Sequence, residues 1–188
     1  MDAHTALLTR ASIGALSEPA PDAEVMERAF RAALRAPDHR LLRPWRFLVI
    51  DGAARERLGQ LFLTAGLADN PAMPDVERQR LLAMPLRAPL VVVAVMSPKT
   101  DPKVPPVEQV LSAGASVQNL LLSLHADGFC GMWRTGWMAE HPRVNAGLGL
   151  APSESIAGFI YIGTPTAGPK PSSPLLVNDF VRSWNPDA

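Results

Sequence analysis

The chain has 188 residues, enough for one domain with a substantial buried core, and we expect residues 1–188 to form a single domain. Its 18 Lys and Arg residues balance 18 Asp and Glu residues, which argues against nucleic acid or an anionic membrane surface as the main partner. The lone Cys130 cannot form an internal disulfide, no N-terminal stretch resembles a signal peptide, and the longest apolar run is far too short to span a bilayer. We therefore expect a soluble, cytoplasmic protein.

Hydrophobic periodicity predicts helices and strands along most of the chain. A short helix around residues 6–8 precedes a longer one that begins near Pro21, where the ring suits a first helical turn, and that carries apolar pairs at helical spacing. A strand over residues 46–50 is closed by the turn signal Asp51-Gly52. The further predicted elements are helices at 53–67 and 75–84, a strand at 90–96, helices at 107–126 and 142–148, and a strand at 156–162.

Two of these elements are apolar without a clear polar face. Strand 90–96 (LVVVAVM) shows no polar alternation, which predicts a central strand covered on both faces. Helix 107–126 is apolar around most of its circumference, which predicts a central helix buried on nearly all sides. Whether a second subunit contributes to this burial is left open by the sequence. The proline-rich tail, residues 166–188, is predicted to wrap over a neighbour.

A basic loop joins the helix that ends near Ala36 to the strand at 46–50. It carries His39 and three arginines, and the prolines Pro37 and Pro44 disfavour helical geometry for the residues before them, so the backbone fixes both ends of the loop. Cationic donors on a stiff loop suit a small anionic ligand, because positioning them takes little further ordering. A solvated connection whose arginines only cover the surface explains the loop equally well.

Three motifs occur in a fixed order that covers nearly the whole chain. The first is Arg10-Ala11-Ser12, and the second is Ala36-Pro37-Asp38-His39 leading to Pro44-Trp45-Arg46-Phe47. The third runs from Gly128 to Gly136, follows a helix reading SAGASVQNL, and contains Trp133-Arg134-Thr135-Gly136. The later segment Gly163-Thr164-Pro165 fits the same pattern. Together they resemble the nitroreductase family of FMN-dependent oxidoreductases, and a short bacterial subgroup in particular. The resemblance implies an α+β three-layer sandwich, with a central, mostly antiparallel sheet flanked by helices, in an intertwined homodimer that holds two FMN molecules at its interface.

The same resemblance implies which residues hold the cofactor. The expected FMN-binding residues are Arg10, Ala11, Ser12, Arg35, His39, Trp133, Arg134 and Thr135. The chain departs from the commoner family pattern at three positions, with Ala11 in place of a second arginine, Leu41 in place of an asparagine and Arg43 in place of a glutamine. One cation is therefore missing near the phosphate, and Arg40 or Arg43 is a candidate to replace it.

A flavin carries its own redox chemistry, so we expect no catalytic side chain in the strict sense. The implied reaction passes electrons from NAD(P)H through FMN to a nitroaromatic, a quinone or a similar flat acceptor. Trp133 or Trp137 could stack near the flavin, although a partly buried core position explains both, and Trp137 better. The histidines show no metal-ligand spacing with one another or with Cys130, so no metal is expected.

Two other functions remain open from the sequence. A flavin-binding protein of the same fold would act in sensing or flavin turnover without nitroreductase activity. A helical interaction module would bind no cofactor, and its arginines would be surface charge.

Overall fold

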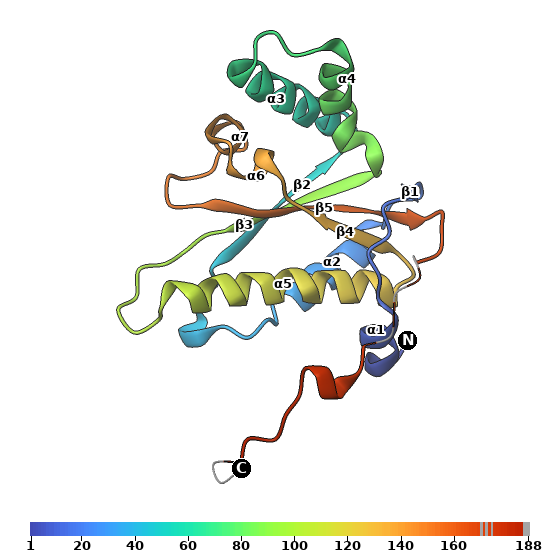
Figure 1. The fold of residues 1–188 in the computed structure, drawn as a ribbon, viewed down its shortest axis with the longest axis vertical. Helices are drawn as coiled ribbons and strands as arrows, with labels where there is room; N and C mark the ends of the chain where they lie inside the picture. The colour runs from blue at the N-terminus through green and yellow to red at the C-terminus, as the bar shows by residue number, and fades with distance from the viewer. Residues whose placement is uncertain (170, 172, 174, 186–188) are drawn as a thin grey trace.

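The computed structural model of the chain describes residues 1–169, 171, 173 and 175–185, and a five-stranded sheet crosses the middle of this part (Figure 1). Its strands are β1 (Leu16–Ser17), β2 (Trp45–Asp51), β3 (Leu90–Met96), β4 (Cys130–Arg134) and β5 (Ser155–Pro165). The strand order is β1-β5-β3-β2, β4 also pairs with β5, and every pairing is antiparallel. The expected α+β fold with an antiparallel central sheet is confirmed.

Helices form a layer on each side of the sheet, as Figure 1 shows. One layer contains α3 (Ala54–Asp69), α4 (Asp75–Ala83), the 3-10 turn η2 (Met84–Arg87), α6 (Trp137–Glu140) and α7 (Pro142–Gly147). The other contains α1 (Ala3–Thr9), α2 (Ala23–Ala33), the 3-10 turn η1 (His39–Leu41) and α5 (Pro106–Ala126), and the tail adds the turn η3 (Val177–Asp179). No helix in the described part of the chain is long and apolar enough to cross a membrane.

Strand β3 supplies both cores of the molecule. Its alternate residues Val91, Val93 and Val95 join one buried cluster, under α3, α6 and α7. Leu90, Val92 and Ala94 join the second cluster, against α2 and α5. Because successive side chains of a strand point to opposite faces, an unbroken apolar run is what such a position requires. The prediction of a central strand covered on both faces is confirmed.

Strand β5 contains a bulge opposite the end of β3. Ala94 faces Gly158 while Val95 faces Ile156, so Ala157 has no partner residue on β3. A bulge bends its strand and redirects the neighbouring groups. Here the carbonyl oxygen of Ala157 accepts a hydrogen bond from the indole of Trp133 on β4.

Helix α5 is buried on one side only, so the expectation of burial on nearly all sides is wrong for the protomer. Its residues Val117, Leu120 and Leu124 are almost inaccessible, because they pack in the core between α2 and the sheet. Its N-terminal half leaves an apolar stripe in solvent, made of Val107, Val110 and Leu111, which are 53–66% exposed. A helix of this composition still has one apolar face without a partner.

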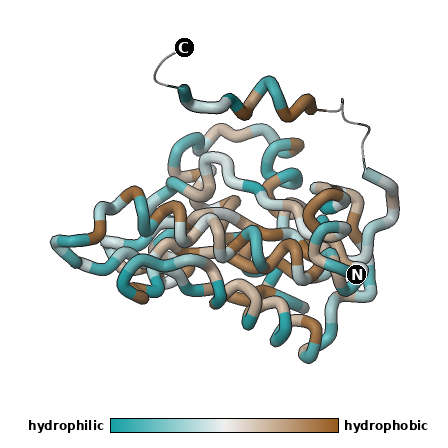
Figure 2. The backbone as a smooth tube through the Cα atoms, turned by 90° about the horizontal axis from the view of Figure 1, so that it is seen from below, coloured by the Kyte–Doolittle hydropathy of each residue, from teal (hydrophilic) through white to brown (hydrophobic). Residues whose placement is uncertain are grey.

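The described part of the tail stands away from the rest of the chain. Figure 1 shows it extending beyond the helical layer of α1, and Figure 2 shows that it carries apolar residues. Its exposed apolar side chains are Leu175, Leu176, Val177, Phe180, Val181 and Trp184. A neighbour that would cover them is not part of the protomer, so the expected wrapping stays a prediction.

Candidate functional site

Arg134, the last residue of β4, separates two cavities. One, the β1 cleft, has a volume of about 510 Å³ and is lined by residues 12–15, Met132, Arg134, Ala167 and Gly168. The other, the α4 pocket, has a volume of about 530 Å³ and lies between α4, the start of α6 and the middle of β5. The guanidinium carbon of Arg134 lies 5.7 Å from the centroid of the Tyr161 ring. Among the described residues, Arg134 has no acidic partner.

The segment that follows α1 forms the wall of the β1 cleft and passes close to Arg134. A Cβ atom placed on Gly14 would lie 3.1 Å from an Nη atom of Arg134 and 3.0 Å from the sulfur of Met132, so a side chain there would crowd both. Ser12 lines the cleft with an exposed side chain whose hydroxyl has no hydrogen-bond partner in the described chain. A cation and a free hydroxyl therefore face the same opening.

Arg10 adds positive charge close to this cleft. It caps the end of α1, where its backbone N–H donates to the carbonyl of Ala6. Burial raises the pKa of the Cys130 thiol at the start of β4, and the positive charge of Arg10 opposes that rise. Arg10 has no acidic partner in the described part of the chain, and Ala11 beside it contributes no charge. The local field therefore favours an anion.

Trp133 and Thr135 flank Arg134 but lie in different surroundings. The Trp133 indole donates to the carbonyl of Ala157 at 3.0 Å and lies beside Gly114 of α5, on the face of the sheet opposite Arg134. Gly158 leaves the space for this ring, since a Cβ there would collide with the indole nitrogen. Thr135 instead lines the α4 pocket together with Arg134.

Arg35 opens onto a third cavity, on the far side of α5. This groove, of about 570 Å³, lies between α1, α2 and α5, and its other lining residues are mostly apolar. Arg35 follows the end of α2, is exposed, and forms no ion pair with the described residues. It is a free cation at the rim of an apolar groove.

His39 lines a fourth cavity, of about 350 Å³, and is held by an acid. Its Nδ1 lies 2.6 Å from Oε2 of Glu108 on α5. The loop around it is strained, because Arg40, Leu41 and Arg43 all have positive φ angles, of 63°, 55° and 51°. The carboxylate of Asp38 accepts the backbone N–H of Arg43 at 2.6 Å and stabilises this conformation.

Arg40 is not free to replace the missing family arginine. Its Nε donates to Oδ2 of Asp101 at 3.0 Å, and that carboxylate is only 15% exposed. Arg43 has no such ion pair with the described residues and remains a candidate. The loop thus combines paired and unpaired cations, which the sequence alone does not distinguish.

Within one protomer, the predicted residues do not share a single cavity. Ser12 meets Arg134 in the β1 cleft, and Thr135 meets Arg134 in the α4 pocket. Arg35 and His39 lie at separate openings beside α5. Sequence analysis missed the residues that complete the α4 pocket: Glu77, Arg80, Leu81, Met84, Phe159 and Tyr161. Their spacing along the chain gives no signal, because only the packing of α4 beside β4 and β5 brings them together.

Trp137 belongs to this pocket rather than to the core. Its side chain is 41% exposed, lines the pocket, and makes an edge contact with the ring of His141 at 5.5 Å between centroids. The preference for a core position is therefore wrong. In the described ranges, no group of three or more His, Cys, Asp or Glu side chains is placed to hold a metal ion.

Comparison with known proteins gives a consistent result. The model of the Nitroreductase family matches residues 7–164. The chain is 38% identical over 165 residues to the "Putative NAD(P)H nitroreductase YdjA" of Escherichia coli K12, an alignment that covers 88% of this chain and 89% of that protein. It is 37% identical over 167 residues to the "Putative NAD(P)H nitroreductase" of Haemophilus influenzae, covering 87% and 89%.

Solved structures share the same fold. The nitroreductase-like family protein of Bacillus cereus matches with a TM-score of 0.82 at 20% identity and covers 98% of this chain and 96% of that one. A mutant of the FMN and NADPH-dependent nitroreductase NfnB from a Sphingopyxis strain matches with a TM-score of 0.78 at 19% identity, covering 99% and 100%. At such identities the likeness establishes the fold.

Proposed function

Because the chain belongs to the nitroreductase family, we propose that it binds FMN and passes electrons from NAD(P)H to a nitroaromatic, a quinone or a similar flat acceptor. The family and its relatives establish an oxidoreductase of nitroreductase type. The cofactor and the acceptor are the parts that we infer. We further propose that residues 1–188 act as one FMN-binding domain in the cytoplasm.

The observation that carries the proposal is the unpaired positive charge at the β1 cleft. Arg134 and Arg10 have no acidic partner in the described chain, and the hydroxyl of Ser12 is free. The missing side chain of Gly14 leaves room beside Arg134 for a ligand to approach. Planar guanidinium groups donate two parallel hydrogen bonds to phosphate and remain charged at every physiological pH. Arg10 and Ser12 fit the phosphate of FMN, and Arg134 fits the edge of the flavin ring, where negative charge gathers on reduction.

When bound, FMN supplies the redox chemistry, namely hydride acceptance from NAD(P)H and electron delivery to the acceptor. The chain's own residues bind and orient. Arg134 and Arg10 neutralise negative charge on the ligand, and Ser12 donates a neutral hydrogen bond. We therefore propose that no side chain acts as a general base.

We propose that the complete site forms in a homodimer. Arg35 and His39 open away from the β1 cleft, so they can reach a ligand held by Arg134 only if they come from a second copy. Two exposed apolar surfaces support such an assembly: the stripe of Val107, Val110 and Leu111 on α5, and the apolar side chains of the tail. Apolar surface of this kind gains stability when a partner removes it from water.

An absorption spectrum of the purified full-length protein, recorded anaerobically before and after NADPH, tests the function. We expect a flavin spectrum that NADPH bleaches. Flavin that NADPH leaves oxidised would instead favour a role in sensing or flavin turnover. Protein without flavin, whose melting temperature does not rise when FMN is added, would contradict cofactor binding, because a ligand specific for the folded state must stabilise it. Riboflavin is the matched control, since it lacks the phosphate and should stabilise less.

A further inference from the structure

The α4 pocket has an aromatic wall and a cationic mouth. Trp137, Phe159 and Tyr161 line it beside the side chains of Met84 and Met138, and its volume is about 530 Å³. Phe159 is fixed by an edge contact with Phe62, at 5.3 Å between ring centroids. A cavity with flat, preformed apolar walls suits a planar aromatic ligand.

Two arginines line the same pocket without partners. Neither Arg80 on α4 nor Arg134 on β4 forms an ion pair within the described residues. Glu77, which lies three residues before Arg80 on α4, also lines the pocket but is exposed and has no such contact with it. The pocket therefore keeps a net positive charge.

Tyr161 adds a neutral donor to this wall. The residue is only 3% exposed, and its hydroxyl has no hydrogen-bond partner in the described part of the chain. Burial raises the pKa of Tyr161, while the charges of Arg87 and Arg134 oppose the rise. The phenol therefore keeps its proton at neutral pH and can donate a hydrogen bond to an anion. Its oxygen is not one of the fully buried, unpartnered side-chain atoms, so it keeps accessible surface where Tyr161 lines the pocket, and a ligand there can accept its hydrogen bond.

We propose that the α4 pocket binds the electron acceptor, and that this acceptor is a flat aromatic molecule that carries an anionic group, such as a nitroaromatic acid. The exposed ring of Trp137 stacks on the aromatic ring of the acceptor, while Arg80 and Tyr161 hold its anionic group. Arg134 lines both this pocket and the β1 cleft, so an acceptor held here lies next to the proposed cofactor site. The inference rests on the proposed function for the redox step itself.

The net reaction balances with NAD(P)H, the reductant of the proposed function. One nitroaromatic acid, one NAD(P)H and one proton give the nitroso acid, NAD(P)⁺ and one water. The hydride of NAD(P)H supplies both electrons. The carboxylate of the acceptor takes no part in the bond changes, so its recognition by Arg80 affects selectivity rather than chemistry.

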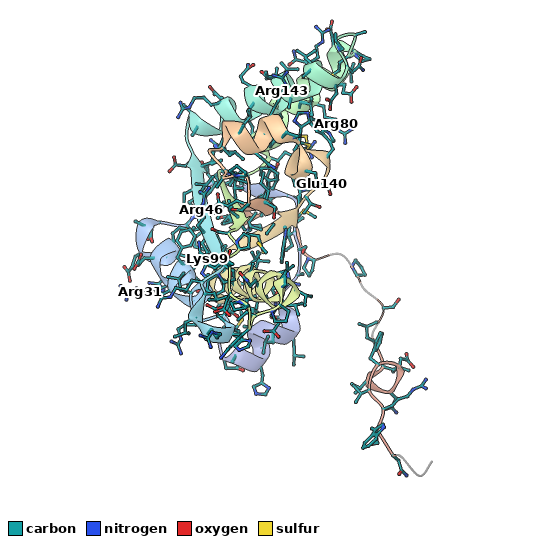
Figure 3. All side chains as sticks on the ribbon, turned by 90° about the vertical axis from the view of Figure 1, so that its left-hand side faces the viewer. Arg31, Arg46, Arg80, Lys99, Glu140 and Arg143 are labelled. Carbon is teal, nitrogen blue, oxygen red and sulfur yellow. The ribbon has the colours of Figure 1, made fainter. Side chains whose placement is uncertain are left out.

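The test compares a carboxylate with its neutral isostere. On the FMN-loaded protein, kcat/KM is measured for 4-nitrobenzoate and 4-nitrobenzamide, and the ratio of the two is the readout. In Arg80→Gln this ratio should fall about tenfold, since a charged hydrogen bond is lost only for the carboxylate. Arg143→Gln is the matched control, because it removes the same charge from α7, in the same helical layer (Figure 3), outside the pocket lining. An unchanged ratio in Arg80→Gln would overturn the inference.

A binding measurement separates this inference from the proposed function. 2-Naphthoate and 2-naphthamide cannot be reduced here, and their affinities for the purified full chain are measured by calorimetry with or without bound flavin. Arg80→Gln should weaken naphthoate about tenfold relative to naphthamide, and Trp137→Leu should weaken both. If naphthoate binds in this way but NADPH reduces no flavin, the proposed function fails and the pocket stands. If NADPH reduces the flavin but Arg80→Gln binds naphthoate with wild-type affinity, the pocket assignment is wrong and the proposed function stands.

Discussion

Replacing Arg134 by glutamine removes the cation that the two cavities share while keeping most of the side chain's length. A hydrogen bond to a charged group contributes about 1.5–3 kcal/mol, so the dissociation constant for FMN should rise about 10- to 150-fold. The contact of Arg134 with the Tyr161 ring, at 5.7 Å, contributes only about 0.5–1 kcal/mol to folding at a partly exposed position. The affinity should therefore change far more than the free energy of unfolding.

The assay is a titration of the flavin-free protein with FMN, followed by quenching of flavin fluorescence. Arg134→Lys keeps a charge without the planar fork and should give an intermediate affinity. Arg143→Gln controls for the loss of one positive charge. Urea denaturation of each flavin-free variant verifies that the fold persists.

An Arg134→Gln variant that binds FMN within twofold of the wild-type affinity would refute the placement of Arg134 at the cofactor. A fall in unfolding free energy well above about 1 kcal/mol would show instead that Arg134 has a structural role that its contacts do not explain.

Three further perturbations follow from the packing. Arg46 donates to both carboxylate oxygens of Glu154, at 2.6 and 2.8 Å, and lowers its pKa to about 2. This pair should contribute about 1–3 kcal/mol to the free energy of unfolding at pH 7, and solvent screening puts it at the lower end because Arg46 is 34% exposed. The contribution should disappear as the pH falls from about 4.5 towards 2, because the Glu154 carboxylate is then protonated. Urea denaturation should therefore find Glu154→Gln less stable than wild type at pH 7 and equally stable at low pH. Leu111→Asp in the exposed stripe of α5 should give monomers in analytical ultracentrifugation at low micromolar concentration, and an unchanged dimer would exclude that surface. Gly158→Ala should cost about 1–3 kcal/mol and displace Trp133, visible as a shift of tryptophan emission, whereas wild-type emission would contradict the observed contact.

Sequence analysis predicted correctly those elements whose hydrophobic pattern alone determines how they are buried. Strand β3 has the predicted bounds, residues 90–96, because a short apolar run bounded by loops has few alternatives. Strand β4 was missed, because Gly131 and its neighbours show no alternation. Gly131 is required by tertiary contact, since a Cβ there would collide with Leu121 of α5. A two-residue strand such as β1 carries no periodicity at all.

The site residues likewise fall into those that sequence motifs predict and those that only tertiary packing brings to the site. Family motifs predicted Ser12 and Arg134, and the fold brings them to one cleft although they lie far apart in the sequence. The motifs could not show that His39 is paired with Glu108, since that contact depends on how the loop meets α5. Arg80 was missed because the charged pattern of α4 equally fits a solvated helix. Only the position of α4 above β5 directs that residue to a pocket.

The central claim is that cations from two copies of the chain hold one FMN. It is tested most directly with hybrid dimers, in which an Arg134→Gln chain and an Arg35→Gln chain carry different affinity tags and are co-purified. If Arg134 and the partner's Arg35 meet at the same ligand, one site in each hybrid is intact and the other has both defects. The account predicts one FMN bound per hybrid dimer with wild-type affinity. Two weakened sites, one with the Arg134 defect and one with the Arg35 defect, would contradict it.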